Sequence, residues 1–148
     1  MAKSKNNIQL DPKHPIYVGI DVHKRTWSIA LVHKGELIKS FAMPSIFNRL
    51  EATLSRYQKH QIYSCYEAGF SGYWLHDELT RIGVQNSVVA TNKIPLEVGN
   101  KVKTDKRDSI KLAKFLSQNL LKPIHIPSPE QRDLRQLLRT REHLMKKK

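Results

Sequence analysis

The first third of the chain alternates between hydrophobic and polar positions. Ile16, Val18 and Ile20 fall on one face of an extended segment, and Asp21 falls on the opposite face near its end. This period of two predicts a β-strand with one buried face. Two further apolar runs within residues 26–43 flank the turn HKGE, which is a hairpin signal. Three consecutive antiparallel strands are therefore expected to open the domain.

After this region, the pattern switches between the helical period and short apolar runs. Ser45 and Thr104 are expected to be helix N-caps, and Gly83 the glycine that ends the second helix. Leu112, Phe115, Leu116 and Leu120 are expected to form the apolar face of the third helix. The expected elements are a helix over 45–57, a strand over 61–68, a helix over 71–83, a strand over 84–90 and a helix after residue 104.

The order β-β-β-α-β-α-β-α predicts a mixed sheet with helices on its faces. It is the element order of a ribonuclease-H-like (RuvC-like) α/β fold. We assign this domain to residues 16–122, after a flexible polar segment over 1–15. Residues 123–148 are expected to form a connector and then a helix, whose start signals are Ser128, Pro129 and Gln131.

The last helix carries an apolar stripe with no obvious surface of the domain to bury it. The stripe consists of Leu134, Leu137, Leu138, Leu144 and Met145 on an otherwise charged helix. Because most helical stability comes from packing an apolar face, we expect this helix to pack against a partner helix or to continue into a further domain. A homo-oligomer formed through this helix is the corresponding prediction.

Charge narrows the class of partner. The 148 residues include 26 Lys and Arg but only 13 Asp and Glu, which gives a formal net charge of +13. Such an excess favours a polyanionic partner, nucleic acid before membrane. No apolar run approaches the ~20 residues that cross a bilayer, and the N-terminus lacks a secretory signal. The single cysteine, Cys65, is expected in a buried strand, and a reducing cytoplasm is the expected compartment.

Four carboxylates stand at the ends of elements. Asp21 ends the first strand, Glu67 ends the fourth, and Asp105 and Asp108 lie one turn apart at the start of the third helix. Strand ends and adjoining helix starts converge in α/β sheets. Packed carboxylates repel each other unless cations are present, and the charge of all four would match two Mg²⁺ or Mn²⁺ ions. Two such ions can activate a water or hydroxyl and stabilise the leaving oxygen of a phosphodiester.

Basic residues surround this acidic set. They are Lys24, Lys93, Lys101, Lys103, Lys106, Arg107 and Lys111. We expect these side chains to neutralise backbone phosphates rather than to read a base sequence. Together, the acids and the basic residues predict a metal site that acts on nucleic acid.

Simpler interpretations stay open. Asp105 and Asp108 could favour the positive end of the helix, a contribution of about 0.3–1 kcal/mol each. Asp21 could be a turn residue and Glu67 a loop acid. Actin-like kinases also place an aspartate after their first strand, but no glycine-rich phosphate loop follows Asp21. A further alternative is a module that binds nucleic acid and assembles an oligomer without activity of its own.

Some aromatic and imidazole side chains also carry expectations. Trp74, at helical spacing with two leucines, is expected in the core, and Tyr73 is the better surface candidate. His23 is expected to be an exposed neighbour of Asp21. His33 and His60 are expected to face solvent.

Three motifs resemble a known family. The segments YVGIDVHK, YEAGFSGYWL and KVKTDKRDSIKLAKFL, within residues 17–121, resemble the N-terminal catalytic domain of the DEDD transposases of bacterial insertion sequences. That family includes the Piv-type DNA invertases. The resemblance implies a RuvC-like fold and a tetrad of Asp21, Glu67, Asp105 and Asp108 that binds Mg²⁺ or Mn²⁺ and acts on DNA phosphodiesters.

The resemblance also implies partners. Family members recombine DNA and are directed by a structured guide RNA, which implies a protein of the bacterial cytoplasm without membrane association. Their chains continue through a coiled coil into a second domain that carries a serine nucleophile. The helix after Ser128 resembles the start of that coiled coil. The serine-bearing domain is expected to be absent here, which would leave the fragment incomplete for full recombination.

Overall fold

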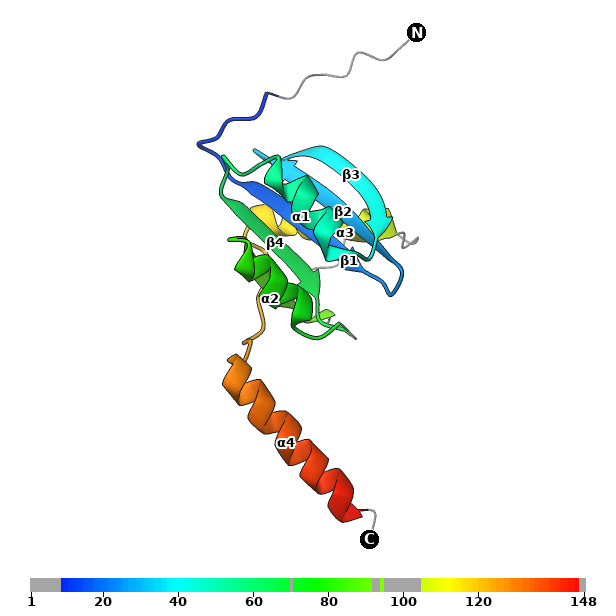
Figure 1. Cartoon of the computed structure of the whole chain (residues 1–148). Helices are drawn as coiled ribbons and strands as arrows, with labels where there is room; N and C mark the ends of the chain where they lie inside the picture. The colour runs from blue at the N-terminus through cyan, green and yellow to red at the C-terminus, as the bar shows by residue number, and fades with distance from the viewer. Residues whose placement is uncertain (1–8, 70, 92–93, 95–104, 147–148) are drawn as a thin grey trace.

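The computed structural model describes residues 9–69, 71–91, 94 and 105–146, without the side chains of residues 105 and 106. Within these residues, five strands form a mixed sheet in the order β3-β2-β1-β4-β5 (Figure 1). β1, β2 and β3 form an antiparallel meander, whereas β4 runs parallel to β1 and β5 parallel to β4. The predicted mixed α/β sheet is confirmed. The strands are β1 (Ile16–Val22), β2 (Thr26–His33), β3 (Glu36–Pro44), β4 (Ile62–Glu67) and β5 (Gln85–Val89).

Two helices, α1 (Phe47–Ser55) and α2 (Trp74–Arg81), cover one face of the sheet (Figure 1). The predicted inward face of β1 is confirmed, because all three of its aliphatic side chains are fully buried there. Burying one such side chain stabilises the fold by roughly 1.5–3 kcal/mol. The main core cluster includes Ile16, Val18, Ile20, Ile29, Leu31, Leu50, Leu54, Tyr66, Leu75, Leu79 and Val88.

The helix α3 (Asp105–Ser117) covers the opposite face and approaches β1 closely. Gly19 makes this approach possible. A Cβ atom at Gly19 would overlap the carbonyl oxygen of Ser109 and lie 2.6 Å from the backbone nitrogen of Ala113. Leu112 is buried on the same side of the sheet. The helix backbone therefore touches the middle of β1, and this contact fixes where the first turns of α3 stand.

The chain leaves α3 differently from the prediction. The helix ends at Ser117, and Asn119 turns the chain with a φ of 56°. Because this left-handed residue changes the direction of the chain, Leu120 points to solvent with 49% of its surface exposed. Leu121 is buried in its place. The expectation that Leu120 belongs to the apolar face of the helix is wrong.

Two predicted helix signals are confirmed. Gly83 follows α2 with a φ of 89°, the left-handed conformation of a terminating glycine. The start of α4 (Pro129–Lys146) carries a reciprocal capping box. The hydroxyl of Ser128 accepts a hydrogen bond from the N–H of Gln131, and the side-chain oxygen of Gln131 accepts one from the N–H of Ser128, each at 3.2 Å.

The predicted N-cap of α1 is wrong. Ile46 holds that position and makes no side-chain capping bond. The hydroxyl of Ser45 instead donates to the carbonyl oxygen of Lys24 at 2.8 Å. Ser45 therefore ties the start of α1 to the turn between β1 and β2. Thr104, the predicted N-cap of α3, lies outside the described residues.

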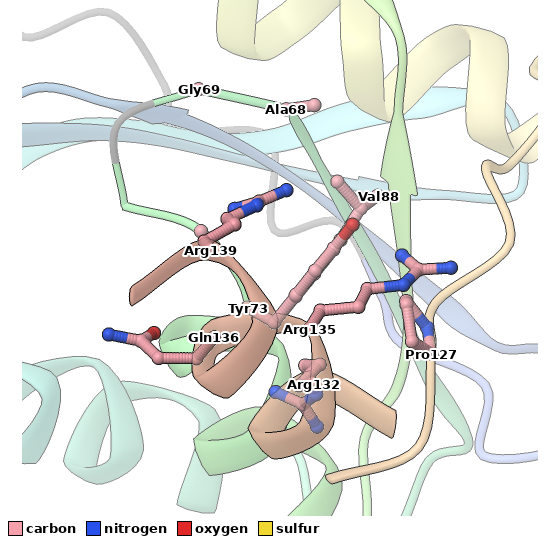
Figure 2. Close-up of a pocket in the computed structure, with 10 residues that line it drawn as sticks. Ala68, Gly69, Tyr73, Val88, Pro127, Arg132, Arg135, Gln136 and Arg139 are labelled. Carbon is pink, nitrogen blue, oxygen red and sulfur yellow. The ribbon is translucent and has the colours of Figure 1, made fainter. Parts of the chain in front are cut away.

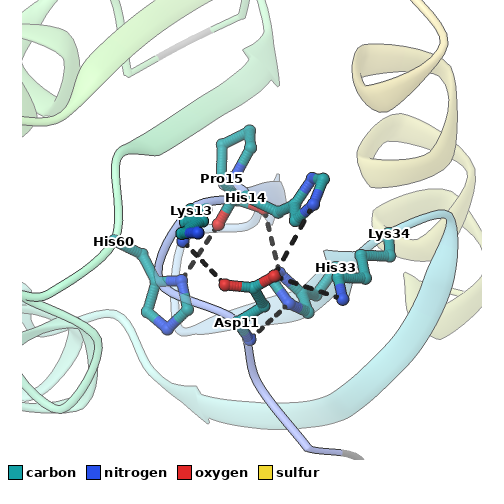
Figure 3. Close-up of polar contacts among 7 residues, drawn as sticks. All are labelled: Asp11, Lys13, His14, Pro15, His33, Lys34 and His60. Carbon is teal, nitrogen blue, oxygen red and sulfur yellow. Dashed lines mark hydrogen bonds and ion pairs between the residues drawn. The ribbon is translucent and has the colours of Figure 1, made fainter.

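His33 is buried, although the sequence interpretation placed it in solvent. Only 1% of its surface is exposed. Its Nε2 accepts a hydrogen bond from the N–H of Asp11 at 3.0 Å, and its Nδ1 donates to the carbonyl oxygen of Pro15 at 3.1 Å (Figure 3). His60, which is half-buried, donates from Nδ1 to the carbonyl oxygen of His14 at 3.0 Å. Both imidazoles hold the segment before β1 in place through hydrogen bonds. The hydrophobic pattern of the sequence does not indicate such a role.

Trp74 is more exposed than predicted. It leaves 52% of its surface exposed, while its ring centroid lies 6.2 Å from that of Phe47 and 6.4 Å from that of Trp27. Because Trp74 is the first residue of α2, its ring packs at the edge of the core. The next residue, Leu75, is the one that enters the core.

The helix α4 projects away from the sheet (Figure 1). Its apolar stripe is exposed, from 50% at Leu138 to 70% at Leu137. Arg132 joins the helix to the domain by donating to both carboxylate oxygens of Asp77 at 2.8 and 3.0 Å. Among the described helices, none is long and apolar enough to cross a membrane.

Candidate active site

Asp21 and Glu67 stand at the carboxyl ends of two neighbouring parallel strands. The last parallel pair of β1 and β4 joins Ile20 to Tyr66, so the two acids are the next residue on each strand. Paired strands lie about 4.7–4.9 Å apart. The two backbones are therefore close enough for the carboxylates to share a ligand.

The first turns of α3 stand over the end of β1. Asp21 pairs across the antiparallel ladder with Ser28, and the hydroxyls of Ser28 and Ser109 share a hydrogen bond of 3.3 Å. Gly19, which faces the same side as Asp21, is the contact point of the α3 backbone. Asp108 immediately precedes Ser109. Three of the four predicted acids therefore come from elements that meet at one edge of the sheet.

Hydrogen bonds hold the two strand-end acids. His23 donates from Nε2 to Oδ2 of Asp21 at 3.0 Å, with the Asp21 side chain 18% exposed and that of His23 50% exposed. The hydroxyl of Thr91 donates to Oε2 of Glu67 at 3.3 Å. His23 is exposed as predicted, but its hydrogen bond to the carboxylate was missed. These contacts orient both acids at the sheet edge.

The donors at this edge are carboxylate oxygens, the ligands that Mg²⁺ and Mn²⁺ prefer. Among the side chains that the structure describes, no group of three or more His, Cys, Asp or Glu is arranged to hold a metal ion. The side chain of Asp105, one of the four predicted ligands, lies outside that description. The donor chemistry fits a hard divalent cation, and the tetrad as a set stays a prediction.

Cys65 adjoins the site without belonging to it. It is fully buried under α3, where its Sγ donates to the carbonyl oxygen of Leu112 at 3.7 Å. Burial raises the pKa of the Cys65 thiol far above its usual range, and the negative charge of Glu67 raises that pKa further. Because only a thiolate acts as a nucleophile or metal ligand, this cysteine has a packing role.

The structure describes part of the predicted phosphate-binding set. Lys24 and Arg107 are exposed, and Lys111 is half-buried. Arg107 and Lys111 flank Asp108 on α3, so two cations lie within one turn of a predicted ligand. Lys93, Lys101, Lys103 and the side chain of Lys106 lie outside the described residues.

Sequence reasoning missed three arginines on α4, Arg132, Arg135 and Arg139. They line a cavity of about 420 Å³ (Figure 2), whose walls also include Ala68, Gly69, Gly72, Tyr73, Val88 and Pro127. Because Ala68 directly follows Glu67, the cavity lies at the same end of β4 as that acid, and Val88 in its wall belongs to the core cluster on the α2 face. The arginines recur at three and four residues, on the side of the helix away from its leucines. This spacing is the sequence signal that could have identified these arginines as one surface.

Solved structures show the class of fold. RuvC from Thermus thermophilus in complex with a Holliday junction substrate aligns with a TM-score of 0.56 and 13% identity, over 75% of this chain and 100% of that chain. A second Thermus thermophilus RuvC structure aligns with a TM-score of 0.53 and 12% identity, over 74% and 99%. At these identities the likeness shows the fold alone. The domain has the predicted ribonuclease-H-like α/β fold.

Sequence relatives show the family. The model of the IS110-type DEDD transposases, described as "Transposase", matches residues 18–148, and the chain belongs to this family. The transposase for insertion sequence element IS1533 of Leptospira borgpetersenii is 35% identical over 139 residues, covering 89% of this chain and 40% of that protein. The protein y4qE of Sinorhizobium fredii is 33% identical over 134 residues, covering 84% and 33%. The chain thus spans less than half the length of these relatives.

Proposed function

We propose that this chain is the metal-dependent catalytic domain of a DNA transposase or recombinase, in which Asp21, Glu67, Asp105 and Asp108 act on DNA phosphodiesters. One observation carries the proposal. In a member of a transposase family, Asp21 and Glu67 end adjacent parallel strands beneath the start of α3. Functional groups of α/β sheets gather outside the carboxyl ends of the strands.

The four acids would hold two Mg²⁺ or Mn²⁺ ions through carboxylate oxygens. When bound, such a pair supplies an activated water or hydroxyl and stabilises the leaving oxygen of a phosphodiester. The chain itself contributes preorganisation. The β1–β4 ladder sets the spacing of Asp21 and Glu67, while His23 and Thr91 fix the direction of their carboxylates.

The basic residues around the acids would bind the DNA backbone. Without them, the negative charge of the acids would repel the phosphates that the site must approach. The formal net charge of +13 supports this role, since cationic side chains release counterions from nucleic acid. The residues are Lys24, Lys93, Lys101, Lys103, Lys106, Arg107 and Lys111.

The proposal extends to partners. The exposed stripe of α4 would form a coiled coil with a second copy of the chain, and the basic surface would accept a structured guide RNA as well as DNA. The chain spans 40% and 33% of its relatives. The resemblance to the DEDD transposases further implies a serine nucleophile in another domain of a longer protein, so the tetrad would either cleave DNA itself or assist that serine. The bacterial cytoplasm is the proposed compartment.

Thermal unfolding in increasing Mg²⁺ or Mn²⁺ tests the metal site. An ion that binds only the folded chain raises the free energy of unfolding by about 2.7 kcal/mol at 100 times its dissociation constant. We expect this rise in the wild type and its loss in Asp21→Asn. Asp133→Asn, an equal charge change on the exposed helix α4, should retain it.

A second function is the alternative outcome of this experiment. If neither ion raises the stability of the wild type, even with a DNA duplex present, the metal site is refuted. The chain would then be a nucleic-acid-binding and oligomerisation module, a function that the positive charge and the exposed stripe of α4 favour.

A further inference from the structure

We propose that the cavity between α4 and the segment after β4, here called the arginine groove, binds the phosphodiester backbone of a nucleic-acid strand. Arg135 and Arg139 would contact the phosphates, and Arg132 would hold the groove in place. None of these three arginines is among the basic residues proposed above to surround the acidic tetrad. The inference shares with the proposed function the premise that nucleic acid binds the chain, but it requires no metal.

Arg132 orients the start of α4 against α2. It forms two hydrogen bonds with Asp77 of α2, at 2.8 and 3.0 Å. Its guanidinium also lies 5.4 Å from the centroid of the Tyr73 ring. A planar guanidinium held by a bidentate carboxylate and an aromatic face has a defined orientation. Arg132 therefore sets the helix face that lines the groove.

Arg135 and Arg139 place two positive charges at this groove. They lie three and seven residues after Arg132, on the same face of the helix. Figure 2 shows both side chains extending from α4 beside Tyr73, with Arg139 on the side of Ala68 and Gly69. In the described part of the chain, no carboxylate forms an ion pair with either arginine, and no acid lines the groove. Guanidinium forks suit the paired oxygens of a phosphate.

The opposite wall suits close approach by a strand. Ala68, Gly69 and Gly72 offer backbone and little side-chain volume, and a Cβ atom at Gly72 would meet no atom within 4 Å. The hydroxyl of the buried Tyr66 donates to the carbonyl oxygen of Gly72 at 2.9 Å, which holds this wall. Tyr73 adds an aromatic ring to the groove, against which the guanidinium of Arg132 lies. The volume of about 420 Å³ lies in the range of ligand sites.

The location of the groove favours a polymer over a small phosphate compound. Ala68 belongs to the wall and follows Glu67 in the chain, so the groove and the acids lie at the same end of β4, and one extended strand could reach both. The exposed leucines lie on the other side of α4. A coiled-coil partner and a nucleic-acid strand could therefore occupy the same helix at once.

The test is fluorescence anisotropy with the full chain and short labelled DNA and RNA oligonucleotides, single-stranded and duplex, in EDTA. The variants are Arg135→Gln and Arg139→Gln. Arg141→Gln is the matched control, because it removes the same charge from an exposed position of α4 outside the groove. At about 0.1 M salt, each groove variant should bind about fivefold to tenfold more weakly, with the salt slope reduced by about one. The control should change affinity by less than about twofold.

The pattern of losses identifies the strand. A loss with DNA alone assigns the groove to the target, a loss with RNA alone assigns it to the guide, and a loss with both assigns it to a shared backbone contact. Unchanged binding in both variants, or an equal loss in Arg141→Gln, would refute the groove. Because EDTA removes divalent ions, these results do not depend on the metal site. Conversely, a result that refutes the arginine groove would not change the outcome expected from the metal titration.

Discussion

The helices α3 and α4 are both amphipathic, yet they end in opposite environments. Leu112 of α3 is 1% exposed, whereas Leu137 of α4 is 70% exposed. α3 turns its apolar face to the sheet. α4 turns its basic face to the domain and its leucines to solvent. An apolar stripe therefore predicts that one face of a helix will be buried. That face packs within its own domain only where the domain offers a complementary surface.

The receiving surface of α3 is specific. Gly19 leaves room for the helix backbone, and the serine pair fastens the start of the helix to β2. α4 is joined by the ion pair between Arg132 and Asp77, and exposed pairs of this kind contribute about 0.2–1 kcal/mol. α3 is therefore part of the domain. α4 is weakly attached, with its apolar face available to a partner.

Truncating one leucine on each helix should give the largest contrast. Leu112→Ala removes buried methyl groups and leaves a cavity, so it should lower the free energy of unfolding by about 2–5 kcal/mol. Leu137→Ala should change it by less than about 0.5 kcal/mol at low protein concentration. Urea denaturation measures both values. Equal effects of the two substitutions would contradict the different environments of α3 and α4.

Filling the contact between α3 and β1 should give the next largest effect. Gly19→Ala forces the new Cβ atom against backbone atoms of α3, and we expect a loss of about 3 kcal/mol in the free energy of unfolding. Gly69→Ala is the matched control, because its new Cβ atom would have its nearest neighbour at 4.0 Å. Chemical denaturation compares the two. A Gly19→Ala chain as stable as the control would show that α3 can move away freely.

Breaking the attachment of α4 should give the smallest effect. Asp77→Asn should lower the free energy of unfolding by less than about 1 kcal/mol, while amide hydrogen exchange in the first turn of α4 becomes faster. The hydrogen bonds from Arg132 lower the pKa of Asp77. Their stabilisation is therefore present above the ordinary pKa of an aspartate and is lost as pH falls through the lowered value.

Asp133→Asn is the control for this attachment, since Asp133 is also on the exposed surface but on α4 itself. Hydrogen exchange in the first turn of α4 should keep its wild-type rate there. In the wild type, the protection of these amides, relative to an unfolded peptide at the same pH, should fall only below about pH 4. Exchange that is unchanged in Asp77→Asn would show that other contacts hold α4.

Much of the fold could be predicted because its signals are local. The alternation in β1, the glycine after α2 and the capping box of α4 all lie within a few residues. The errors have longer-range causes. His33 is buried because the segment before β1 supplies both hydrogen-bond partners, and Leu120 is exposed because Asn119 adopts a left-handed conformation.

The residues of the candidate site could be predicted from the sequence better than their arrangement in space. Asp21 and Glu67 could be placed at strand ends from the pattern alone, but their adjacency required the parallel pairing of β1 with β4. The arginines of α4 were missed because the leucines dominate the pattern of that helix. The docking of Arg132 on Asp77 and Tyr73 brings them beside the segment after Glu67.

The serine pair between β2 and α3 also has a consequence for the order of folding. Ser28 and Ser109 are separated by 81 positions in the chain, whereas β1, β2 and β3 pair with their immediate neighbours in sequence. Contacts between distant residues form slowly because a large loop must close first. During synthesis, the meander can therefore assemble early, while the acidic edge is completed only after α3 has emerged. The Ser28–Ser109 contact, and with it the position of α3 over the end of β1, can form only after residue 109 has been translated.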